Sequence, residues 1–127
     1  MPTNIIVTVT PGNPNPNKDV PCNLHVAPPQ YLVDDAIWLD PTQDYNITFN
    51  LPGGGQRTWD TTGGSPFCNQ KGQCPSMTAG TQNGFSVTGK GPYAMTVYVP
   101  SQGGRGVQHY RMNFDNGYTC DPIIVVG

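Results

Sequence analysis

The chain contains no glutamate and has only four alanines and four leucines, so it lacks most of the residues that favour a helix. It has 16 glycines and 14 prolines among its 127 residues, and these residue types end strands and shape turns. We therefore expect an all-β protein. Because a chain of this length usually builds one core, we expect a single domain over residues 1–127.

Charge is also scarce, at 11% of residues with a formal net charge of -2. Nucleic-acid binding needs clustered basic residues, and here they are scattered, so we expect no nucleic-acid partner. No apolar run approaches the roughly 20 residues that span a bilayer, so we expect no transmembrane segment. The six basic residues are Lys18, Arg57, Lys71, Lys90, Arg105 and Arg111.

Residues 1–10 lack the basic start, the apolar stretch and the cleavage site of a signal peptide. An even number of cysteines, four, in a loop-rich chain is nevertheless typical of an oxidising compartment. We expect a secreted or periplasmic protein whose signal peptide is absent from this sequence. The alternative is a cytosolic protein with free thiols.

Apolar side chains recur with a period of two in three segments, Asp44–Leu51, Tyr93–Val99 and Gln108–Phe114. This alternation is typical of a strand with one buried face. The side chains expected to point inward are Tyr45, Ile47, Phe49, Leu51, Tyr93, Met95, Val97, Val99, Tyr110, Met112 and Phe114.

Shorter strands are predicted at Cys22–Val26 and Phe85–Val87. Ile5–Val9 and Ile123–Val126 are apolar on both faces for part of their length, which favours strands buried between layers. Prolines bracket Tyr31–Leu39, which also fits a helical stripe; we interpret it as one strand or two.

Trp38 lies in this last apolar stretch, and we expect it in the core. The count of strands is seven or eight, separated by turn signals such as Asn116-Gly117. This pattern predicts one β-sandwich, with Greek-key connections and an immunoglobulin-like character.

The segment from about residue 52 to residue 82 breaks the alternation and holds seven glycines. Loops of this length are usually functional or disordered. Within it, an exposed Trp59 indole, beside Asp60 and close to Arg57, would suit stacking on a sugar ring or anchoring of a protein partner. These three are the candidate binding residues. The alternative is that Trp59 folds back and closes the core beneath the loop.

The four cysteines allow three disulfide pairings, and sequence alone leaves all three open. We favour Cys68 with Cys74, because both lie in the long loop, and Cys22 with Cys120, because both flank predicted strands. No Cys-x-x-Cys spacing supports redox chemistry, so structural bridges are the preferred interpretation.

The end of the chain, from about Tyr93 to Gly127, has two alternating strands, a glycine-containing loop and the ending Asp-Pro-Ile-Ile-Val-Val. This arrangement resembles small exported bacterial domains with a cupredoxin-like sandwich and no assigned function. The resemblance implies a fold and no activity.

A blue-copper centre needs two imidazoles, a thiolate and usually a thioether. In copper-binding members of the cupredoxin family, the cysteine, second histidine and methionine cluster near the last strands, but no histidine or methionine follows Cys120. His25, His109 and Met112 remain, and alternation places the last two on opposite faces of one strand. Asp34, Asp35 and Asp40 lack the spacing of an EF-hand calcium loop. We expect no metal site and no cofactor.

No nucleophile-elbow sequence lies near either histidine, and the adjacent Asp34 and Asp35 would face opposite ways on a strand. We expect no catalytic residues and no enzyme activity. The chain is expected to be a non-catalytic exported binding or structural module with an unknown protein or glycan partner. The alternatives are a carbohydrate-binding module that uses loop aromatics and a metal-binding cupredoxin-like protein.

Overall fold

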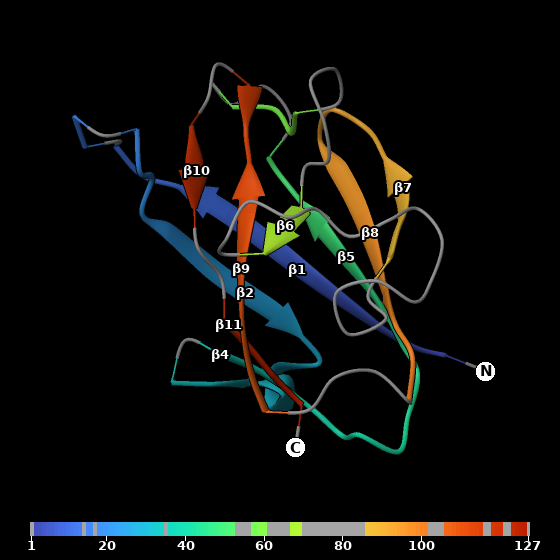
Figure 1. Ribbon diagram of the computed structural model, residues 1–127. Coiled ribbons are helices and arrows are strands. Elements are labelled where there is room, and N and C mark those ends of the chain that lie inside the picture. The colour runs from blue at the N-terminus through green and yellow to red at the C-terminus, as the bar shows by residue number, and fades with distance from the viewer. Residues whose placement is uncertain are drawn as a thin grey trace.

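A computed structural model of the chain shows an all-β protein that also contains a short 3-10 turn, η1 (Pro29–Tyr31) (Figure 1). The structure describes residues 2–13, 15–16, 18–34, 36–52, 57–60, 67–69, 86–101, 106–115, 118–120 and 123–126. The strands in this part of the chain are β1 (Thr3–Pro11), β2 (Cys22–Ala27), β3 (Leu32–Val33), β4 (Ala36–Leu39), β5 (Tyr45–Asn50), β6 (Phe67–Asn69), β7 (Ser86–Lys90), β8 (Ala94–Val99), β9 (Gly106–Asn113), β10 (Thr119–Cys120) and β11 (Ile123–Val126). No helix in these described ranges is long and apolar enough to cross a membrane.

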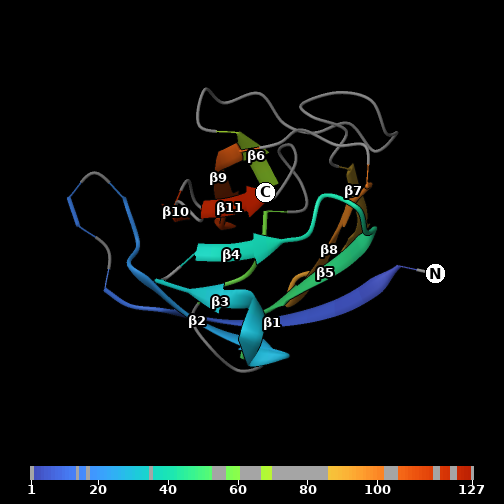
Figure 2. The ribbon, with the colours of Figure 1, turned by 90° about the horizontal axis from the view of Figure 1, so that it is seen from below.

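The strands form two sheets. The first has the order β2-β1-β5-β8-β7, in which β1 and β5 are parallel and the other neighbours are antiparallel. The second has the order β10-β9-β11-β4-β3, with β6 beside β9 and a parallel pair between β11 and β4. Figure 2 shows β4 and β11 in one layer and β1 and β5 in the other.

One hydrophobic core lies between the sheets, because alternate side chains of each sheet point inward. The five-stranded sheet contributes Ile5, Val7, Val9, Val26, Tyr45, Ile47, Phe49, Val87, Met95, Val97 and Val99. From the second sheet come Ile37, Leu39, Met112, Cys120 and Ile124. The predicted two-residue alternation is therefore the pattern that builds the core.

β5 and β8 follow the prediction closely. Both bury every second side chain, and they pair antiparallel along their full lengths. Tyr93 was expected to be the first inward residue of its strand, but it is 39% exposed. It precedes β8, which begins at Ala94, so it is outside the pleat that directs its neighbours inward.

Two predictions about burial are wrong, one for the strand β1 and one for the Trp38 side chain. β1 was expected to be buried on both faces, yet Ile6 is 40% exposed, because its side of the strand faces away from the core. Trp38 was expected in the core but is 46% exposed on the outer face of β4. The segment that contains Trp38 forms η1 followed by two strands, as one of the two interpretations predicted.

Candidate functional site

The connection between β1 and β2, residues 12–21, is rich in asparagine and proline, and its described residues project beyond the sheets (Figure 1). Gly12 N donates to Pro21 O (2.6 Å) at its base. A Cβ atom at Gly12 would lie 3.1 Å from Pro21 Cγ, so the close approach of the two ends favours glycine here. Higher in the loop, Lys18 N donates to Asn15 O, and Lys18 adopts a left-handed conformation with φ 65°.

The Asn15 side chain organises the tip of this loop. Its Oδ1 accepts from Asp19 N at 3.0 Å, and its main-chain N–H donates to Asp19 O at 2.9 Å. Such local side-chain bonds are the reason asparagine favours turns. The loop is thereby folded back on itself.

The loop is also fastened to the second sheet. Val20 N donates to Thr119 O at 2.7 Å, and Thr119 N donates to Lys18 O at 3.0 Å. Thr119 Oγ1 adds a longer bond to Asp19 Oδ1, at 3.4 Å. A connection from one sheet is therefore held by β10 of the other, which fixes its shape.

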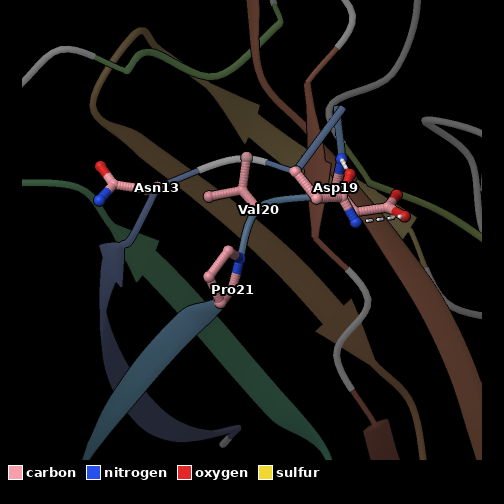
Figure 3. A pocket seen from close by; sticks show the side chains of 5 residues that line it. Asn13, Asp19, Val20 and Pro21 are labelled. Carbon is pink, nitrogen blue, oxygen red and sulfur yellow. Dashed lines mark hydrogen bonds between the residues drawn. The ribbon is translucent and has the colours of Figure 1, made fainter. Parts of the chain in front are cut away.

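An open hollow of about 520 Å³ lies in this loop. We call it the β1–β2 loop pocket, lined by Asn13, Asn15, Asp19, Val20 and Pro21. Figure 3 shows Asn13 on one side and Asp19 on the other, with Val20 and Pro21 between them. The pocket thus combines a small apolar floor with amide and carboxylate groups, a mixture common in ligand sites.

A cationic and aromatic cluster lies next to the pocket in the fold. The Arg57 guanidinium carbon lies 3.9 Å from the centre of the Tyr118 ring, and Lys18 Nζ lies 5.3 Å from it. Each is within the range of a cation–π interaction. Lys18 precedes the pocket residue Asp19, and Tyr118 precedes Thr119, which is bonded to Asp19 and Val20, so the cluster adjoins the pocket.

Of the three predicted binding residues, Trp59 is not available to a ligand, because it is 1% exposed. Its ring stacks on Phe114 with centroids 5.0 Å apart, and its Nε1 donates to Phe49 O at 3.2 Å. The exposed-indole hypothesis is thus wrong. The alternative, in which Trp59 closes the core, is what the structure shows.

Main-chain hydrogen bonds to the β7–β8 connection and to the end of β9 hold residues 58–60 in place. Trp59 N donates to Pro92 O, Asp60 N donates to Asn113 O, and Asp115 N donates to Thr58 O. The Thr58 hydroxyl also donates to the Asp115 carboxylate. Asp60 is half-buried, and only Arg57 of the predicted three joins the surface next to the β1–β2 loop pocket. Other parts of the predicted 52–82 loop, apart from Pro52 and β6, lie outside the described residues.

The Cys68–Cys74 pairing stays a prediction, but the preferred Cys22–Cys120 pairing is absent from the structure. Cys22 carries a free thiol whose Sγ donates to Val20 O at 3.7 Å, and Cys120 is buried on β10. The structure therefore contains no Cys22–Cys120 bond. Cys68 lies on β6, and Cys74 lies outside the described residues.

The two histidines lie in different sheets, His25 on β2 and His109 on β9. Among the described residues, no three His, Cys, Asp or Glu side chains come together in a group able to hold a metal ion. Met112, the thioether considered for copper, is fully buried in the core.

No family model, no curated protein and no solved structure matches this chain. The cupredoxin-like resemblance of the C-terminal region therefore rests on the sequence pattern alone.

The sequence predictions missed the pocket residues, Asn13, Asn15 and Asp19, and the Tyr118 ring. The available signal was the run Pro-Gly-Asn-Pro-Asn-Pro-Asn at residues 11–17. Such a run marks a turn-rich connection but does not show that β10 lies beside it. That neighbour is more than 90 residues away in the sequence, at Thr119.

Proposed function

We propose that this chain is a non-catalytic, exported binding module built on an immunoglobulin-like or cupredoxin-like Greek-key sandwich. It works without a cofactor and recognises a protein or glycan partner through the β1–β2 loop pocket and the adjoining Tyr118 cluster. The even number of cysteines in a loop-rich, charge-poor sequence supports export.

The observation that carries this proposal is the way the pocket is built. Its Asp19 and Asn15 groups are fixed by hydrogen bonds within the loop and to Thr119, so they lose little conformational freedom when a ligand binds. Asn13, on the opposite wall, makes no hydrogen bond within the described residues and is exposed. Its amide is free to donate to a ligand and to accept from one.

A glycan is the second, more specific candidate, because amide and carboxylate groups around a small apolar floor suit hydroxyl-bearing ligands. This version moves the carbohydrate site from the predicted Trp59 to the loop pocket. A protein partner would use the same groups to bind exposed main chain.

The test is a two-dimensional amide NMR titration with a panel of oligosaccharides and unmodified peptides. We expect one class of ligand to shift the Asn13 and Asn15 side-chain amides, and Asn13→Ala to weaken its binding by about tenfold. Asn4→Ala, an exposed asparagine on β1, is the matched control. Binding that shifts other resonances and is unchanged in Asn13→Ala would reject the pocket as the site.

A further inference from the structure

The β3–β4 hairpin carries two of the large hydrophobic side chains that the described structure leaves exposed. Trp38 is 46% exposed and Val33 is 45% exposed. The Trp38 Nε1 donates to Val33 O at 3.3 Å, which holds the indole against the hairpin. Because its one donor is already used, the ring can offer a ligand only its π surface and its apolar edge.

Carboxylates lie on both sides of this indole along the chain. Asp34 follows Val33 directly, adopts a left-handed conformation with φ 50° at the turn, and is exposed. Its side chain makes no hydrogen bond or ion pair within the described residues. Asp40 is also exposed and lies two residues beyond Trp38, with the buried Leu39 between them. We call Val33, Asp34, Trp38 and Asp40 the Trp38 surface.

The negative charge at Asp40 is stabilised locally. Its Oδ1 accepts from Thr42 N at 2.8 Å and from Thr42 Oγ1 at 2.7 Å. These bonds lower the pKa of the Asp40 carboxyl below its usual value, so this group is ionised at neutral pH.

No lysine or arginine lies near these carboxylates in the sequence. Residues 19–56 contain five aspartates and no lysine or arginine. An exposed indole with carboxylates close to it in the sequence is complementary to a cation, since the face of a tryptophan ring attracts positive charge more strongly than that of other aromatic residues. A neutral sugar would gain the stacking and leave the charge without a role.

We propose that the Trp38 surface binds an arginine or lysine side chain presented by a basic segment of a partner protein. The cation stacks on the Trp38 ring while it is attracted by the carboxylates of Asp34 and Asp40, which lie close to Trp38 in the sequence. This site is separate from the β1–β2 loop pocket and does not depend on it.

The test is a titration of the protein with hexa-arginine, followed by calorimetry and by tryptophan fluorescence. The emission change reports on Trp38, because the only other tryptophan, Trp59, is buried. We expect Trp38→Ala to weaken binding by about two- to fivefold. The matched control is Tyr93→Ala, which removes another exposed aromatic ring and should leave the affinity unchanged.

Charge is tested separately with the double variant Asp34→Asn and Asp40→Asn. It should weaken hexa-arginine binding and reduce its dependence on salt between low ionic strength and about 0.5 M.

Equal affinity of wild type and Trp38→Ala for hexa-arginine, or binding of hexa-glutamate as tight as that of hexa-arginine, would overturn the proposal. Quenching of Trp38 by an oligosaccharide with no response to hexa-arginine would also overturn it and assign a sugar platform instead. Asn13→Ala should not affect hexa-arginine binding. If the Trp38 surface does not bind hexa-arginine, the proposal for the β1–β2 loop pocket is still tested separately by the NMR titration.

Discussion

Trp59 and Trp38 each donate an indole hydrogen bond to a main-chain carbonyl, at 3.2 Å and 3.3 Å, yet one is 1% exposed and the other 46%. Trp59 belongs to the hydrophobic core, where its ring stacks on Phe114 and its Nε1 reaches the Phe49 carbonyl of β5. Trp38 lies on the outer face of β4, where the described structure places no further layer. The same interaction thus completes the core in one region and presents a surface in the other. What separates them is how many layers of the fold cover the ring.

The largest expected difference is between the two alanine variants. Trp59→Ala removes a large buried side chain and its stack on Phe114, and we expect a loss of about 3–5 kcal/mol in the free energy of unfolding. Trp38→Ala should cost less than about 1 kcal/mol, because its ring is half in solvent. Urea unfolding of the two variants measures this difference. Similar losses would show that the two rings are not buried to different extents.

A finer comparison replaces each tryptophan with phenylalanine, which keeps an aromatic ring and removes the N–H donor. Trp59→Phe leaves Phe49 O without its indole donor inside the core, and we expect a loss of about 1–3 kcal/mol. Trp38→Phe should be within about 0.5 kcal/mol of wild type, because water can replace the indole at Val33 O. Urea midpoints for both variants test the assignment, and a larger loss for Trp38→Phe would contradict it.

A hydrogen bond from Asp40 N to the Tyr45 hydroxyl, at 2.9 Å, links the Trp38 surface to the hydrophobic core, because Tyr45 is a core residue. Burial raises the pKa of Tyr45, because the phenolate is disfavoured in the core. The resulting stability is fully present below the unfolded tyrosine pKa of about 10 and is lost as pH rises through the higher folded value. We expect unfolding free energies measured from pH 8 upward to fall with pH, and to fall less in Tyr45→Phe. The same slope in Tyr45→Phe and in the wild type would contradict this assignment.

The smallest expected effect is the contribution of the exposed Asp40 carboxylate to the pH dependence of stability. Because the bonds from Thr42 lower the pKa of Asp40, its contribution to stability is present above the unfolded aspartate pKa of about 4 and is lost as pH falls through the folded value. Asp40→Asn should therefore flatten the acid side of the stability profile slightly. Identical profiles for wild type and Asp40→Asn would show that the Thr42 bonds have no such role.

Strand alternation was the part of the fold that could be predicted. The inward residues of β5 and β8 were assigned correctly, except for Tyr93, because a pleated strand directs successive side chains to opposite faces whatever surrounds it. The two strands of the β3–β4 hairpin were also within the predicted alternatives.

The strands were predicted well because alternation is a local property of the sequence. The candidate site was predicted poorly because it depends on contacts between distant segments. Alternation is local, but the pocket exists only because residues 18–20 lie beside Thr119. Arg57 was selected for its position near Trp59, and its contact with Tyr118 depends on how the long loop meets the end of β9. No spacing in the sequence predicts the contact of residues 18–20 with Thr119 or the contact of Arg57 with Tyr118.

The sequence by itself determined that the protein is built from strands, since it has few helix-forming residues and many that end strands, and its apolar residues alternate. Only the tertiary structure decided which apolar residues are covered. Trp59, in a glycine-rich segment, became core because main-chain bonds to Pro92 and pairing with Phe114 bring it between the sheets. Trp38, in an apolar run, became surface because burial depends on whether another layer packs against a face, and that is a property of distant segments rather than of the run itself.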